Sequence, residues 1–228
     1  MLGNDRIQPV TQFTEVIVRG EFAEFVSNRF AVTYMLSDEC ARSGKVLVSA
    51  SVIGLNGYVG AFCASAPSYR AVFPDLPAQA GTCATNGVLG TAVGVMGTLQ
   101  AQIVLSLLID LKPSVVGRMI TVDFRTLRFS GFSFLSAREE RSGLRFIARS
   151  EVTSADLTVE LRGEEEAPQP AFASSLRVTP DRIESLLGRV ASDVRVVFCC
   201  RTGLRAWRAA ARLQAAGHCN VVLFAAGD

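Results

Sequence analysis

The sequence predicts an α/β protein made of two successive blocks, because strand-like and helix-like segments alternate in both. In the first block, the strand-like segments 45–53 and 58–63 are followed by a long apolar run at 88–109. In the second block, the apolar segment 194–199 leads through a short loop into the helix-like segment 206–216. A buried strand followed directly by a loop and a helix is typical of α/β sheets.

Length and composition limit the function classes that need to be considered. The chain has 228 residues, 49% of them hydrophobic and 19% charged, which allows a sizeable core. Its net charge of +2 predicts no nucleic-acid partner. The first ten residues lack the basic start and apolar stretch of a signal peptide, so we expect a cytoplasmic protein. None of the six cysteines forms a CxxC pair, and His218 is the single histidine.

Short elements are expected before the apolar run. Residues 14–18 read as a strand, residues 21–26 as a short helix or turn, and residues 29–43 as a helix with one apolar side. The turn between the two following strands contains Asn56-Gly57, which supplies a positive φ.

The run from Gly81 to Asp110 carries no charged side chain before its last residue. Its glycines at 90, 94 and 97 would lie on one side of a helix, where another backbone can approach closely. Segment 88–109 is long enough to span a membrane. Three polar side chains near its middle and the lack of a flanking basic cluster argue against that, so we expect no membrane partner. A buried core helix is the second possibility.

A third interpretation of this run comes from its resemblance to a known protein family. Segments 27–38, 47–57, 83–101 and 117–129 resemble the ThiF/MoeB/HesA family of adenylyltransferases, which activate small sulfur-carrier proteins and are related to ubiquitin-activating enzymes. The resemblance covers residues 25–135 and implies a buried helix, often near a dimer interface. It places Cys83 in the family's cysteine loop. Cys83 is then either an acceptor or relay thiol, or a passive loop residue.

Several departures from the family pattern concern its cofactors. The family uses ATP and magnesium and often binds zinc, but Asn28 stands where its Mg-ATP aspartate is expected. Ser68 and Ala71 replace two zinc cysteines, the second cysteine pair after Phe134 is missing, and no glycine-rich phosphate loop is present. We therefore expect the C-terminal half of a Rossmann-like ThiF-type fold without its nucleotide-binding half, and no cofactor or metal in this chain.

The second block contains a candidate reactive cysteine at the end of its apolar strand. In Cys200-Arg201-Thr202-Gly203-Leu204-Arg205, backbone N–H groups, a helix N-terminus and two arginines converge on the thiol. These groups favour a thiolate and the terminal anion of a persulfide. The alternative is a packed thiol with surface arginines. Cys199 should point to the opposite side of the strand, into the core.

This block is similar to the rhodanese family of sulfurtransferases. Cys200, Gly203 and Arg205 match its Cys-x-x-Gly-x-Arg loop, Glu160 stands in the place of an aspartate, and residues 220–227 resemble its closing segment. The expected organisation is a partial ThiF-type domain at 1–136, a charged linker at 137–152 and a small rhodanese-like α/β domain at 153–228.

Together the two resemblances imply a sulfur-transfer protein. Its partners would be a small ubiquitin-like sulfur-carrier protein and a sulfur donor such as a cysteine desulfurase or thiosulfate, in thiamine or molybdopterin-type biosynthesis. The glycine-bearing helix predicts a homodimer. The alternative is a non-catalytic interaction or dimerisation module, or a truncated adenylyltransferase.

Overall fold

The computed structural model describes residues 17–19, 22–26, 30–76, 87–139, 143–186 and 190–227. They pack into two compact units, which are described separately below. The first unit contains described residues of 1–28, 43–66 and 81–136, and the second those of 29–42, 67–80 and 137–228.

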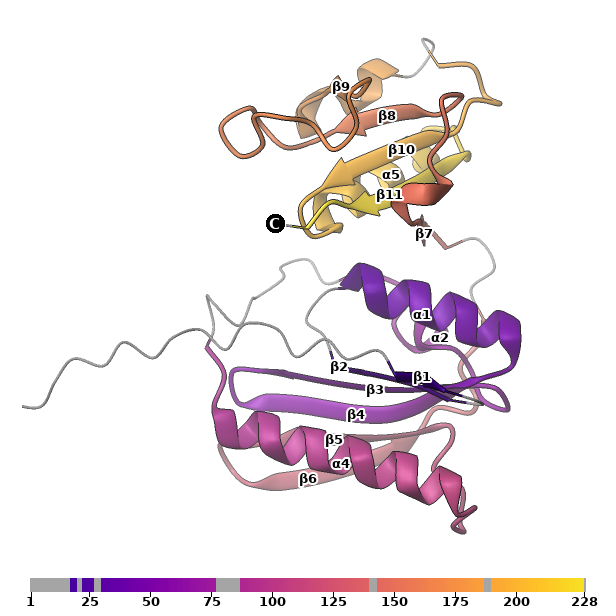
Figure 1. Ribbon diagram of the computed structural model, residues 1–228, viewed down its shortest axis with the longest axis vertical. Coiled ribbons are helices and arrows are strands. Elements are labelled where there is room, and N and C mark those ends of the chain that lie inside the picture. Colours follow the sequence, from indigo (N-terminus) through magenta and orange to yellow (C-terminus); the bar gives the residue numbers. More distant parts are fainter. Residues whose placement is uncertain are drawn as a thin grey trace, which may run out of the picture. The chain divides into compact units, whose positions relative to one another are not determined.

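The first unit is built on a six-stranded sheet in the order β1-β2-β3-β4-β5-β6 (Figure 1). The strands are β1 (Ile17–Arg19), β2 (Phe22–Val26), β3 (Val46–Ile53), β4 (Asn56–Cys63), β5 (Arg118–Asp123) and β6 (Arg128–Ser133). Only the β2–β3 pairing is parallel among these strands. The prediction of a helix or turn at 21–26 is therefore wrong, because pairing along β3 overrides the weak local pattern.

The turn between β3 and β4 also differs from the sequence prediction. Ile53 pairs with Asn56, so only Gly54 and Leu55 form the loop, and Gly54 takes the positive φ of 57°. Asn56 and Gly57 already belong to β4, and Gly57 faces the sulfur of Met96.

Helix α4 (Gly90–Leu108) packs against β3 and β4 (Figure 1). Met96 and Ile103 lie in one apolar cluster with Val48 of β3 and Val122 of β5. The glycines at 90, 94 and 97 lie on the opposite, exposed side, with open space where a Cβ would be. By length and composition alone α4 could cross a membrane, a test that the core helices of soluble proteins also pass.

The second unit contains a five-stranded sheet in the order β7-β11-β10-β8-β9, and all its pairings are parallel. The strands are β7 (Arg145–Phe146), β8 (Leu157–Glu160), β9 (Leu176–Arg177), β10 (Val196–Cys200) and β11 (Val221–Ala225). Helix α5 (Leu204–Ala215) packs on β10 and β11 and contacts the 3₁₀-helix η2 (Pro180–Leu186). Residues 145–151, expected to be linker, form β7 and the 3₁₀-helix η1 (Arg149–Glu151), because β7 pairs with β11.

Two elements from the expected first domain belong to this second unit. They are α1 (Phe30–Ser43), whose existence the sequence predicts, and the single turn α2 (Tyr69–Val72). Tyr34 of α1 packs against Phe146 of β7 and Trp207 of α5. The compact units therefore do not follow the expected division at residues 136 and 153.

Candidate functional site

Cys200 is the last residue of β10, and a three-residue loop connects it to α5. The Cys200 Sγ accepts hydrogen bonds from the backbone N–H of Gly203 at 3.2 Å and of Ala206 at 3.3 Å. The side chain is 0% exposed. The loop is shorter than the six residues expected from the sequence, because α5 already begins at Leu204. N–H groups at the start of the helix therefore reach the sulfur. Such donors, at the positive end of a helix, stabilise a negative charge on sulfur.

Gly203 is required at the turn into α5. Its φ is +93°, and a Cβ there would lie 2.4 Å from a ring carbon of Phe146. A left-handed backbone and close approach of a ring both exclude larger residues. Thr202 is exposed and Leu204 is partly buried; the Thr202 hydroxyl oxygen accepts from Leu204 N at 3.4 Å, at the start of α5.

Cys199 points away from this loop, as the alternation of side chains along a strand predicts. It lies in an apolar cluster with Ile147, Val197, Val222 and Phe224. Burial, with smaller contributions from Glu160 and Cys200, raises the pKa of the Cys199 thiol to about 12. Cys199 is therefore a neutral, packed thiol at physiological pH.

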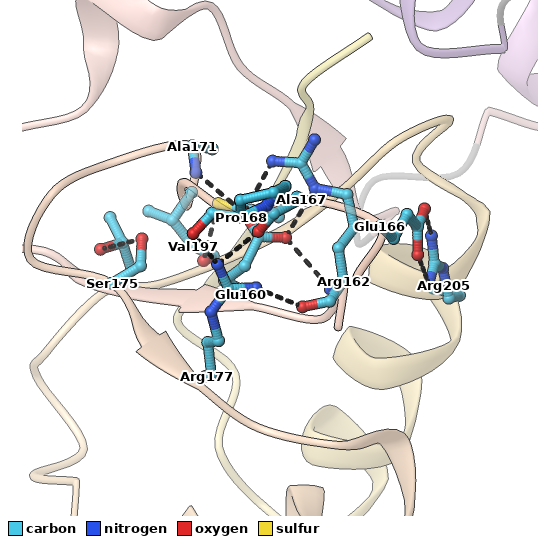
Figure 2. A network of polar contacts seen from close by, with 12 residues as sticks. Glu160, Arg162, Glu166, Ala167, Pro168, Ala171, Ser175, Arg177, Val197 and Arg205 are labelled. Atoms are coloured by element: carbon cyan, nitrogen blue, oxygen red, sulfur yellow. Dashed lines mark hydrogen bonds and ion pairs between the residues drawn. The ribbon is translucent and has the colours of Figure 1, made fainter. Parts of the chain in front are cut away.

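The two arginines expected beside Cys200 differ in their surroundings. Arg205 pairs with Glu166: its Nη1 lies 2.7 Å from Oε2, and its Nη2 contacts Oε1 (Figure 2). The hydrogen bond from Arg205 also lowers the pKa of Glu166. The positive charge of Arg205 is therefore partly compensated by the Glu166 carboxylate. Arg201 is exposed, and its carbonyl accepts from Gly227 N at 3.0 Å. In the sequence, only the acidic run at 164–166 indicated a partner for Arg205.

Glu160 organises the loop that follows β8 (Figure 2). Its carboxylate, 0% exposed, accepts from Arg162 N, Nε and Nη2 and from Ala171 N at 2.8–3.1 Å. Arg177 donates from Nη1 to the Arg162 carbonyl at 2.7 Å and from Nη2 to that of Ala167. The carboxylate therefore has a structural role on the Cys199 side of the sheet, and Cys199 is its register partner on β10.

The residues at the family's zinc positions do not fit a zinc ion. The Ser68 hydroxyl donates to Glu139 Oε2 at 2.7 Å and also caps α2 by accepting from Ala71 N at 3.1 Å. Ser68 N donates to Glu139 Oε1 at 2.6 Å. Neither Ser68 nor Ala71 supplies a thiolate or imidazole. Within the described ranges, no group of three or more His, Cys, Asp or Glu could hold a metal. Asn28 and Cys83 lie outside the described residues.

Residues 26–144 match the model of the ThiF family. This match covers more than half of the chain.

The chain belongs to the ThiF family.

The match coincides closely with the segments 27–129 that carry the resemblance in the sequence. The chain is 35% identical over 126 residues to "Adenylyltransferase and sulfurtransferase MOCS3" of Dictyostelium discoideum, covering 51% of this chain and 30% of that protein. It is 32% identical over 118 residues to "SAMP-activating enzyme E1" of Haloferax volcanii, covering 50% and 43%. The chain thus spans less than half the length of these curated relatives. The crystal structure of E. coli MccB superposes with a TM-score of 0.43 at 11% identity, over 55% of this chain and 41% of that chain.

The first unit of this ThiF-family chain also carries an exposed apolar surface. All of β6 is exposed, including Phe129 and Phe132, and Leu105 and Leu108 are exposed on α4. A hollow of about 450 Å³, lined partly by Ile103, Ile120 and Phe132, lies between α4 and the β5–β6 hairpin. Large exposed apolar side chains around a hollow are a feature of sites that bind another protein.

Proposed function

We propose that this ThiF-family chain transfers sulfur, with Cys200 as the residue that carries a persulfide. The observation that carries the proposal is the pair of backbone N–H groups, from Gly203 and Ala206, that converge on the Cys200 sulfur at the N-terminus of α5. The same donors would stabilise the thiolate before loading and the persulfide anion after it. The strand, loop and helix around Cys200 support a rhodanese-like function for the second unit.

The chemistry needs only a donor with a sulfane sulfur and an acceptor. The Cys200 thiolate attacks the sulfane sulfur of thiosulfate, a new S–S bond forms, and the bond to the sulfonate breaks with sulfite leaving with its electron pair. A nucleophilic acceptor then takes the outer sulfur. The Cys200 sulfur recovers the electron pair and becomes a thiolate again.

We further propose that the physiological acceptor is a small ubiquitin-like sulfur carrier, in thiamine or molybdopterin-type biosynthesis. Support comes from the family and from the name "Adenylyltransferase and sulfurtransferase" of several relatives. A cysteine desulfurase or thiosulfate would supply the sulfur. The residues of this chain are assigned only the sulfur step, because the positions expected to bind Mg-ATP and zinc carry Asn28, Ser68 and Ala71.

The test compares two neighbouring cysteines. The chain is incubated with thiosulfate, bound sulfane sulfur is counted by mass spectrometry, and transfer to cyanide is measured. Cys200→Ser should abolish loading and transfer. Cys199→Ser is the matched control, because Cys199 is equally buried but lies on the other face of β10, and it should lower stability while loading persists. Sulfur transfer by Cys200→Ser at the parental rate would refute the assignment.

A second candidate function is a non-catalytic interaction module. It is favoured by the complete burial of Cys200 and by the exposed apolar side chains of Phe129 and Phe132 on β6 and of Leu105 and Leu108 on α4. Failure of both the parental chain and Cys199→Ser to load any sulfur, under conditions where both are folded, would favour this function over sulfur transfer.

A further inference from the structure

A buried aromatic cluster joins four segments of the second unit that are far apart in the sequence. The Tyr34 cluster consists of Tyr34 of α1, Tyr69 of α2, Phe146 of β7 and Trp207 of α5. The Tyr34 ring lies 5.5 Å from Tyr69, 6.1 Å from Phe146 and 5.7 Å from Trp207, between ring centroids. Tyr34 is 1% exposed, and the other three rings are buried as well. Such aromatic pairs add stabilisation beyond their buried area.

Polar contacts fix Tyr34 within this cluster. Its hydroxyl donates to the Phe73 carbonyl at 2.6 Å, and the Arg70 guanidinium lies 4.8 Å from the ring centre. Arg70, itself buried, donates from Nε and Nη2 to both oxygens of Asp38 at 2.9 Å and from Nη1 to the Leu144 carbonyl at 2.9 Å. A bidentate pair of this kind restrains both of its partners. The ring of Tyr34 is therefore held from α1, from α2 and from the segment that leads into β7.

The Tyr34 cluster touches the loop that holds Cys200. The Phe146 ring lies so close to Gly203 that a Cβ there would be 2.4 Å from it. Trp207 N donates to the Gly203 carbonyl at 2.8 Å, and Gly203 N donates to the Cys200 sulfur at 3.2 Å. Because Cys200 is 0% exposed, any donor or acceptor can reach the sulfur only when this loop opens.

We propose that Tyr34 is a positioning residue for Cys200 and that, through Phe146 and Trp207, it keeps the Cys200 loop closed. Helix α1, which lies inside the ThiF family match, would then control access to a cysteine about 170 residues later in the chain. A partner that displaces α1 would open the loop. The consequence for sulfur transfer rests on the function proposed above, whereas the closing of the Cys200 loop by Tyr34 does not depend on that function.

The first experiment measures access to Cys200 directly. The full chain is treated with iodoacetamide, and the alkylation rate of each cysteine is followed by peptide mass spectrometry. Tyr34→Leu should speed alkylation of Cys200 by about tenfold. Loss of the aromatic pairs shifts the equilibrium between the closed and open loop by about this factor, and the sulfur reacts only in the open loop. Tyr34→Phe keeps the ring and should stay near the parental rate. Ile183→Ala, which truncates a buried residue of η2 outside the cluster, is the control for general destabilisation.

Two results would overturn the proposal: a parental alkylation rate in Tyr34→Leu, or an equal acceleration in Ile183→Ala. If Tyr34→Leu does not fold, the proposal is tested on the parental chain by tryptophan fluorescence. Trp207 is the single tryptophan, so its emission reports on the Tyr34 cluster. An adduct on Cys200 should change this emission, and unchanged emission on full alkylation would refute the coupling. Neither readout needs sulfur transfer, so a chain that never loads sulfur would disprove the proposed function alone.

Discussion

Replacement of the buried carboxylate of Glu160 should strongly destabilise the second unit. Glu160→Ala leaves the Arg162 guanidinium, 12% exposed, without its carboxylate and the Ala171 N–H without its acceptor. Removing one partner of a buried, hydrogen-bonded ion pair costs about 3–5 kcal/mol. At roughly 2–4 °C per kcal/mol for a chain of this size, the midpoint of thermal unfolding should fall by about 10 °C.

The pH dependence follows from the pKa of Glu160. Burial of the carboxyl raises its pKa, but the hydrogen bonds from Arg162 and Ala171 outweigh burial, and the pKa lies below its ordinary value of 4.5. A lowered pKa in the folded state means that this carboxylate stabilises the fold above pH 4.5, and that the stabilisation is lost as pH falls through the folded-state pKa. The stability difference between the parental chain and Glu160→Gln should therefore be constant near neutral pH and shrink in acid.

The assay is calorimetric or circular-dichroism melting of the parental chain, Glu160→Ala and Glu160→Gln between pH 3 and pH 8. Glu184→Ala is the matched control, because it removes a glutamate that pairs with an arginine, Arg212, where both side chains are about half exposed. Screening by water makes such pairs contribute little. Equal melting temperatures for Glu160→Ala and Glu184→Ala would refute the reasoning.

Three further predictions concern the Cys200 loop, α4 and the expected cofactors. Gly203→Ala should lower stability by at least about 2 kcal/mol, because its φ is positive and Phe146 fills the space of a Cβ; Gly163→Ala, in open space, should be tolerated, and equal melting would contradict this. Gly94→Leu should dissociate the expected homodimer in sedimentation experiments, while it adds about 0.8 kcal/mol of helix propensity to the monomer; an unchanged oligomeric state would remove α4 from the interface. Purified protein should contain no stoichiometric zinc by metal analysis, and calorimetry should detect no micromolar affinity for ATP; either finding would overturn the expectation.

The sequence by itself determined the local pattern around the candidate site. A strand that ends at Cys200, a glycine three residues later and a helix start can be read directly from residue type and spacing. The period of two along a strand also separates Cys199 from Cys200, because neighbouring side chains point to opposite faces. The ThiF resemblance over residues 25–135 likewise depends on ordered local motifs, and the family match at 26–144 confirms it.

Only the tertiary structure decided which distant residues meet. Segment 22–26 is a strand because β3 lies beside it, and 145–146 is a strand because β11 does. Arg205 is compensated by Glu166, 39 residues earlier. Tyr34 joins the unit that contains Cys200 through contacts with Phe146 and Trp207. Spacing along a chain encodes the period of an element, but long-range packing depends on the shape and charge of surfaces that exist only after the chain has folded.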